Sequence, residues 1–294
     1  MRVLIYLIRN AVYSNLFISF CITLLAHQTY ILLELPDTNS FYVLAFIFCS
    51  TFFTYNFQRI YRLKSFELAG KLIGIRLSWI LRNRKKLFFA SMLSACGSLF
   101  FLLQLSYKVF LLVIPLAIFS IWYVIPFIKS GDKKIAIRDL PFTKIVIISL
   151  VWSLVMVAIP VVEAKGIHTL LESKSLFLLS EQFLFIFAIT LPFDIRDLRY
   201  DMESNIKTIP TYLGIKKTIM LSHILLLLFL MLKAVQHYVF LQLSFEQFLA
   251  TVITGGLVML IIAFTKRRRP ELFFSGLIDG SMLLMYFGIL FLEY

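Results

Sequence analysis

Nine long stretches of this chain carry almost no charged side chains, and this pattern constrains the possible folds more than any other feature. Together they contain three Asp, Glu, Lys or Arg residues: Glu181, Lys233 and Asp279. A helix of about 17 to 25 apolar residues spans the hydrocarbon core of a bilayer. The pattern therefore predicts an all-α integral membrane protein with nine transmembrane helices. The stretches are residues 14–33, 41–58, 87–107, 109–128, 145–162, 176–193, 218–240, 247–265 and 272–292.

The composition also indicates a membrane protein, and it gives no sign of a second domain. Hydrophobic residues make up 60% of the chain, whereas soluble domains carry roughly 45–50%. Because no linker rich in Pro, Gly or Ser interrupts the sequence, we expect one polytopic domain over residues 1–294. The net charge of +13 comes from bases between the apolar stretches. Membrane topology and anionic lipid headgroups explain these bases, so we expect no nucleic-acid partner. No protein partner is implied.

The distribution of basic residues predicts the orientation of the chain. With a cytoplasmic N-terminus, 25 of the 29 Lys and Arg residues lie on the cytoplasmic side. They fall in residues 1–13, 59–86, 129–144, 194–217 and 266–269. Such an excess is typical of cytoplasmic segments. We therefore predict a protein of a bacterial-type inner or plasma membrane with its N-terminus in the cytoplasm, and we expect residues 1–13 to form a short interfacial helix.

Three carboxylates directly follow the sixth apolar stretch. Asp194, Asp197 and Asp201 fall within eight residues of a chain that has 16 acidic residues in all. Their spacing places them within an arc of about 60° on a helix. Carboxylates that converge at a membrane surface suggest Mg²⁺, which binds one or two carboxylates together with phosphate oxygens. The alternative is a solvated helix start, with Asp194 as N-cap and Arg196 and Arg199 as salt-bridge partners. Those arginines point to the opposite helical face, so we do not expect them to neutralise the aspartates within the helix.

The sequence around these aspartates resembles a known family. The run Asp194-Ile-Arg-Asp197-x-x-x-Asp201, with its tail Lys207-Thr-Ile-Pro210-x-x-Leu213-Gly214, is similar to the second aspartate-rich motif of the UbiA-type intramembrane prenyltransferases. The number of predicted spans and the place of the motif after the sixth span agree with that family. Three further elements resemble it, namely Tyr123-x-x-Pro126-x-x-Lys129, Arg138-Asp-Leu-Pro141-x-x-Lys144 and Trp152.

The resemblance implies a fold, an activity and a cofactor. The fold is nine helices around a central cavity open towards lipid. The activity is transfer of an isoprenyl group from a prenyl diphosphate to a hydrophobic acceptor, aromatic or lipid-linked, within the membrane. The cofactor is Mg²⁺, held by two aspartate-rich motifs that face each other. Asp194, Asp197 and Asp201 are thus the predicted catalytic and metal-binding residues. Arg138 and Lys144 match the family pattern and are predicted to contact the diphosphate; ordinary positive-inside loop charge is the alternative for both.

The chain departs from this family at the other motif. The family pattern after the second span is Asn-x-x-x-Asp-x-x-x-Asp, and here Asn56 is followed by Ile60 and Lys64 at the two aspartate positions. One hypothesis is that a single Mg²⁺ stays on the aspartates near 194, while Asn56, Arg59 and Lys64 face it and bind the diphosphate. Arg62 is the alternative to Lys64 in this role. A guanidinium suits phosphate because it donates two parallel hydrogen bonds.

Two other functions remain open. The first is a non-catalytic protein of the same fold that binds an isoprenoid lipid or acts as a scaffold. It is suggested by Ile60 and Lys64, because basic side chains do not easily replace the charge stabilisation that a metal gives to the transition state. The second is a small transporter, although transporters place their sites near the bilayer midplane. Among the charges within spans, Asp279 is predicted either to reach the cavity or to pair with a base. We expect Glu181 to lie at the interface.

Overall fold

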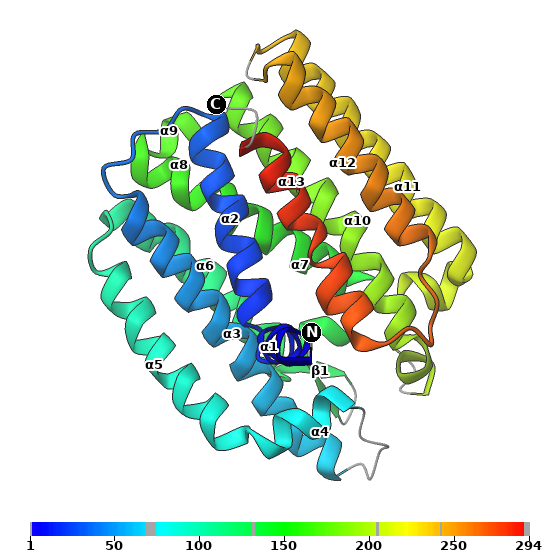
Figure 1. Cartoon of the computed structure of the whole chain (residues 1–294). Helices are drawn as coiled ribbons and strands as arrows, with labels where there is room; N and C mark the ends of the chain where they lie inside the picture. The colour runs from blue at the N-terminus through cyan, green and yellow to red at the C-terminus, as the bar shows by residue number, and fades with distance from the viewer. Residues whose placement is uncertain (1, 69–74, 131–132, 204–205, 242, 291–294) are drawn as a thin grey trace.

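The helices of the chain pack side by side, and one short hairpin lies at one end of them (Figure 1). This computed structural model describes residues 2–68, 75–130, 133–203, 206–241 and 243–290. Its elements in chain order are α1 (Arg2–Tyr13), α2 (Leu16–Leu32), α3 (Ser40–Leu68), α4 (Ile75–Arg82), α5 (Arg84–Leu102), α6 (Tyr107–Trp122), β1 (Ile128–Ser130), β2 (Lys133–Ile135), η1 (Ile137–Asp139), α7 (Thr143–Ser153), η2 (Leu154–Ala158), α8 (Ile159–Ala164), α9 (Ile167–Leu170), α10 (Ser173–Glu203), α11 (Ile209–Tyr238), α12 (Phe245–Ala263), η3 (Phe273–Ile278) and α13 (Ser281–Leu290).

Seven helices among the described residues are long and apolar enough to cross a membrane. An eighth is added if Ile5–Tyr13 and Leu16–Leu32, which meet at 77°, count as one broken span. The predicted stretch 109–128 extends beyond α6, which ends at Trp122 and whose 16 residues fall short of the roughly 20 that a crossing needs. The prediction of an all-helical integral membrane fold is confirmed, whereas the count of nine spans is not. The seven are Ser40–Tyr61, Arg84–Leu102, Thr143–Ala164, Ser173–Glu203, Ile209–Tyr238, Phe245–Ala263 and Phe273–Leu290.

The core lies between α2, α10 and the segment that runs from α7 through η2 to α8. α2 packs between α3 and α13, and α10 packs between α7 and α11 (Figure 1). The π-helical turn η2 touches both α2 and α10. There the Thr29 hydroxyl donates a hydrogen bond of 2.8 Å to the carbonyl oxygen of Met156, which the wider π-turn exposes. Fully buried apolar side chains, including Ile22, Leu25 and Ile189, fill the space between these helices.

The sixth predicted span and the aspartate motif form one continuous helix. α10 runs without interruption from Ser173 to Glu203, so the three aspartates lie on its last turns. Asp194 is therefore inside the helix and is not its N-cap. A continuous helix fixes the aspartates relative to the apolar span, because each residue follows its neighbour by 100° and 1.5 Å.

The tail of the motif turns the chain back against α10. At the start of α11 the backbone N–H of Thr208 donates to the hydroxyl of Thr211 at 2.8 Å, and that hydroxyl donates to the carbonyl oxygen of Thr208 at 2.7 Å. Six residues later Gly214 interrupts the helical backbone with φ +78°, a conformation that glycine adopts without steric cost. The backbone N–H of Phe142 donates to the carbonyl oxygen of Lys207 at 3.0 Å. The tail thus also ties the start of α7 to the end of α10.

Candidate functional site

The three predicted aspartates lie on the inner side of α10. Asp194 and Asp201 are buried, and the side chain of Asp197 is 32% exposed. Lys144 of α7 bridges two of them, since its Nζ lies 2.5 Å from Asp194 Oδ1 and 3.6 Å from Asp197 Oδ2. This contact explains how a lysine is accommodated within a buried cluster, because two carboxylates compensate its charge.

Arg138 joins the same cluster from η1. Its guanidinium lies over the ring of Tyr123, 5.3 Å from the ring centroid. It is close enough to interact electrostatically with Asp194, Asp197 and Asp201. The structure therefore brings five of the predicted site residues together. Their ability to bind a diphosphate stays a prediction.

Our expectation that no arginine of α10 neutralises the aspartates within the helix is wrong. Arg196 Nε donates to Asp197 Oδ1 at 2.8 Å, and Arg196 Nη2 approaches Asp197 Oδ2 at 3.2 Å. The long arginine side chain bends around the helix to its neighbour, which a projection of Cβ directions does not capture. Arg199, in contrast, pairs with Glu203 on the exposed face.

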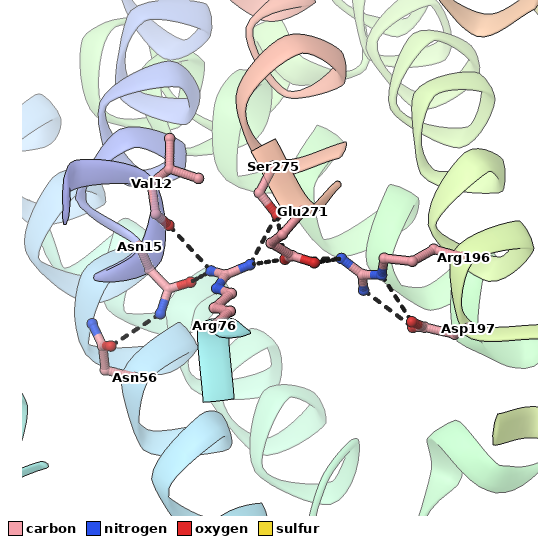
Figure 2. A network of polar contacts seen from close by, with 8 residues as sticks. All are labelled: Val12, Asn15, Asn56, Arg76, Arg196, Asp197, Glu271 and Ser275. Carbon is pink, nitrogen blue, oxygen red and sulfur yellow. Dashed lines mark hydrogen bonds and ion pairs between the residues drawn. The ribbon is translucent and has the colours of Figure 1, made fainter. Parts of the chain in front are cut away.

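A polar network extends from this cluster across the bundle (Figure 2). Arg196 also donates to both carboxylate oxygens of Glu271, at 3.1 and 3.3 Å. On the other side of Glu271, Arg76 Nη1 donates to Oε1 at 2.6 Å and to the hydroxyl of Ser275 at 2.8 Å. Arg76 comes from α4 and is 9% exposed. One carboxylate thus connects a guanidinium of α4 with a guanidinium of α10.

The network ends at Asn56, the residue that matches the degenerate motif. Arg76 Nη2 donates to the carbonyl oxygen of Val12 at 3.2 Å and to Asn15 Oδ1 at 2.7 Å. Asn15 in turn donates to Asn56 Oδ1 at 3.0 Å. The amide of Asn56 donates to the carbonyl oxygens of Ser14 and of Phe52, its own neighbour on α3. Asn56 is therefore connected to the aspartates through Asn15, Arg76, Glu271 and Arg196, and it does not contact them directly (Figure 2).

The other residues predicted on α3 are placed only in part. Arg59 lies near enough to Glu271, a member of this network, to interact with it electrostatically. Lys64 belongs to α3, but its side chain lies outside the described residues, so its predicted role is not tested.

Glu271 and Asp279 supply the acidic side of the network outside α10. Burial alone would raise the pKa of Glu271, but Arg196 and Arg76 outweigh it and hold that pKa below its usual range. Glu271 is therefore anionic at neutral pH. Asp279 is buried close to Arg76, Arg196 and Glu271. Of its two predicted roles, this position agrees better with interaction with bases at this end of the bundle.

Our prediction of an interfacial Glu181 is wrong. Its side chain is fully buried, and Oε2 lies 2.7 Å from Nζ of Lys233 on α11. The two lone charges of the sixth and seventh predicted spans meet because α10 and α11 pack along their length.

The donor set of the aspartate cluster suits one Mg²⁺. Asp201 Oδ2 is buried without a hydrogen-bond partner among the described residues. No group of three His, Cys, Asp or Glu side chains in the described part of the chain is arranged to hold a metal by itself. Mg²⁺ needs only one or two carboxylates when phosphate and water complete its shell. The residues therefore fit a metal that is bound together with a phosphate-bearing ligand.

Sequence reasoning missed Arg76, Glu271 and Asn15. Arg76 belongs to a basic segment whose charges were already explained by membrane topology. Glu271 follows Pro270 and a run of four bases, which were explained in the same way. A signal was nevertheless present in the segment 59–86, which is longer than a hairpin requires. Its helix α4 folds back and inserts Arg76 between the two motif regions (Figure 2).

Comparison with known proteins agrees with the resemblance found in the motifs. The model of the UbiA prenyltransferase family matches residues 79–272. No curated protein matches the chain. An apo structure of a UbiA homologue from Aeropyrum pernix K1 superposes with a TM-score of 0.70 at 14% identity, covering 98% of this chain and 99% of that one.

Two further solved structures share the fold. A UbiA homologue from Archaeoglobus fulgidus bound to GPP and Mg²⁺ gives a TM-score of 0.64 at 12% identity, covering 97% of this chain and 99% of that one. A digeranylgeranylglyceryl phosphate synthase gives 0.60 at 14% identity, covering 97% and 94%. Because the family model spans well over half of the sequence and the shared fold extends over nearly all of it, the chain belongs to the UbiA prenyltransferase family.

Proposed function

We propose that this protein transfers an isoprenyl group from a prenyl diphosphate to an aromatic or lipid-linked acceptor within the membrane, and that it depends on Mg²⁺. The observation that carries the proposal is the cluster of Asp194, Asp197 and Asp201, against which Lys144 and Arg138 lie. Family membership supports it, as do the relatives from Archaeoglobus fulgidus that were solved with Mg²⁺ and either DMAPP or GPP.

Each residue of the cluster has a distinct role in this proposal. Asp194, Asp197 and Asp201 would hold Mg²⁺, which when bound draws negative charge from the leaving diphosphate. Lys144 and Arg138 would donate hydrogen bonds to phosphate oxygens and stabilise the charge that develops as the carbon–oxygen bond breaks. Arg59 and Lys64 would take part from α3, where the family has aspartates. Asn56 would position this side of the site through Asn15.

We further propose that residues 1–294 act as a single domain, with the N-terminus and the aspartate cluster on the cytoplasmic side of a bacterial-type inner or plasma membrane. The number of bases around the cluster supports this orientation, since positive side chains are retained on that side. Arg76, Arg138, Lys144 and Arg196 all meet at this end of the bundle.

Diphosphate release from an allylic prenyl diphosphate tests the proposal without knowledge of the acceptor. The full chain is incubated with the diphosphate in Mg²⁺ or in EDTA. We expect release in Mg²⁺ alone, reduced roughly 100-fold or more in Asp194→Asn and Asp201→Asn, because a metal stabilises several kcal/mol of transition-state charge. Asp37→Asn is the matched control, since Asp37 is exposed in the loop at the far end of α2. Undiminished release in both aspartate variants would exclude the assigned roles.

The alternative function is non-catalytic binding of an isoprenoid lipid on the same fold. The ion pairs Lys144–Asp194 and Arg196–Asp197 favour it, because they already neutralise two of the carboxylates. It predicts that lipid extracted from the purified protein contains an isoprenoid chain, and that no diphosphate is released at any Mg²⁺ concentration.

A further inference from the structure

Two guanidinium groups converge on a single carboxylate at the centre of the network (Figure 2). Arg76 Nη1 lies 2.6 Å from Glu271 Oε1, and Arg196 Nη1 lies 3.1 Å from the same oxygen and 3.3 Å from Oε2. Paired guanidiniums around one anion are the arrangement that proteins use to bind phosphate groups. Here a side chain of the protein itself occupies the position of the anion.

Both guanidiniums are held in place by contacts that do not involve Glu271. Arg76 is anchored by the carbonyl oxygen of Val12 and by Asn15 Oδ1. Arg196 lies against the rings of Phe193 and Phe274, 5.1 and 5.6 Å from their centroids. The two donors would therefore keep their positions if the carboxylate moved away, and such preorganisation lowers the free energy cost of binding.

The Arg76 side chain has an unused donor. Its Nε is buried without a hydrogen-bond partner among the described residues. A buried N–H in this state costs free energy, and such exceptions call for an explanation. A diphosphate offers more acceptor oxygens than one carboxylate does, so it could engage this donor as well.

The location of this pair connects it to the proposed function, on which the inference rests. Arg76 is linked through Asn15 to Asn56, and Arg196 is paired with Asp197. The two guanidiniums thus bridge the α3 region, where Ile60 and Lys64 replace carboxylates, and the aspartates of α10. Arg196 is therefore in direct contact with one of the proposed Mg²⁺ ligands, and Arg76 is connected to it through Glu271.

We infer that Arg76 and Arg196 form a binding site for a diphosphate group, and that Glu271 occupies this site as an internal competitor until a diphosphate displaces it. The diphosphate is that of a prenyl diphosphate. The phosphate of an anionic lipid headgroup has the same chemistry, and the experiment separates the two sources. The side chain of Glu271 is 20% exposed, so it has an open direction in which to move.

Binding of inorganic diphosphate in EDTA measures this site separately from any metal. The full chain in neutral detergent is titrated by calorimetry. We expect Glu271→Gln to bind diphosphate roughly 10 to 100 times more tightly than the wild type, because a competing charged hydrogen bond is removed. Arg76→Gln should weaken binding at least tenfold relative to the wild type. Glu203→Gln and Arg82→Gln are matched controls, because these residues are exposed on α10 and α4, and their affinity should equal that of the wild type.

A second variant guards against loss of folding in Glu271→Gln. Glu271→Asp keeps the charge but is one methylene shorter, so it reaches both guanidiniums less well and should also bind diphosphate more tightly than the wild type. Equal or weaker diphosphate affinity in the folded Glu271 variants would overturn the inference. Tighter binding of phosphatidic acid in mixed micelles without a gain for inorganic diphosphate would also overturn it, in favour of a headgroup site.

The outcomes are separable from those of the proposed function. Tight, Arg76-dependent diphosphate binding in a protein that releases no diphosphate from any prenyl substrate would reject the enzyme and retain the site. Mg²⁺-dependent release that is unchanged in Arg76→Gln would retain the enzyme and reject the site.

Discussion

Two groups of buried charges lie at different depths along the same helix. α10 carries Glu181 near its start and Arg196 and Asp197 near its end, about 24 Å further along the helix axis. At the first position one carboxylate meets one lysine, Lys233 of α11. At the second, carboxylates and guanidiniums from α4, α10 and the residues directly before η3 alternate in a network (Figure 2).

The two groups differ in how many partners each charge has. Lys233 donates a 2.7 Å hydrogen bond to Gln236 and lies beside Glu181, and both ions are almost fully buried. Glu181 Oε1 has no hydrogen-bond partner among the described residues. In the network, Arg76 alone has four acceptors, and the side chains of Arg196 and Asp197 are 23% and 32% exposed. A charge with several partners can exchange one of them for a ligand, whereas a single buried pair is suited to holding two helices together.

The largest expected effect comes from breaking the single pair. Lys233→Met leaves Glu181 buried without a counter-charge, and we expect a loss of about 3–5 kcal/mol of stability. Unfolding of the purified protein measures the loss. The double variant Lys233→Met with Glu181→Leu is the control and should recover most of the stability, because no charge then remains buried. A Lys233→Met protein as stable as the wild type would contradict the assigned difference between the two regions.

A smaller effect is expected at the edge of the network. Asn56→Ala removes the acceptor of the Asn15 amide and the two hydrogen bonds that the Asn56 side chain donates to backbone carbonyl oxygens. We expect a loss of roughly 1–3 kcal/mol in the free energy of unfolding. Thermal unfolding measures it. Asn39→Ala, directly before α3, is the comparison, because it removes a single side-chain hydrogen bond to Glu163 outside the network. If the network exchanges partners as proposed, Arg76 should still bind diphosphate in Asn56→Ala, with affinity reduced less than in Arg76→Gln.

The smallest effect concerns the pH dependence of stability that Glu271 gives to the network. The pKa of Glu271 is held below its usual range, where burial is outweighed by Arg196 and Arg76. A lowered pKa in the folded state contributes stability that is present above the pKa of the unfolded chain, about 4.3, and is lost as pH falls through the lower folded value. The stability difference between wild type and Glu271→Gln should therefore shrink below about pH 4.3. A difference that stays constant down to pH 3 would show that the pKa of Glu271 is not lowered in the folded protein.

Particular residues show how far the sequence reached. The aspartates of α10 were predicted to share one side of a helix and do lie together, because motif spacing along a helix is a local property. Arg138 and Lys144 were assigned to the same site from the family resemblance, and they lie against the aspartates because η1 and α7 pack beside α10. Arg196 was not expected to contact the aspartates, but its side chain is long enough to reach around the helix to Asp197. Glu181 was placed at an interface, because nothing in its own span shows that Lys233 packs against it. Arg76 and Glu271 were missed, since 195 residues separate them in the chain.

The sequence by itself determined that this is a helical membrane protein and where its aspartate face lies. Both follow from quantities that belong to single residues and short spacings: the free energy of moving apolar side chains out of water, and the 3.6-residue period of the helix. Only the tertiary structure decided which base meets which carboxylate. Such pairing depends on the packing of α4, α10 and η3 against one another, and this packing brings two arginines from distant segments onto Glu271 (Figure 2).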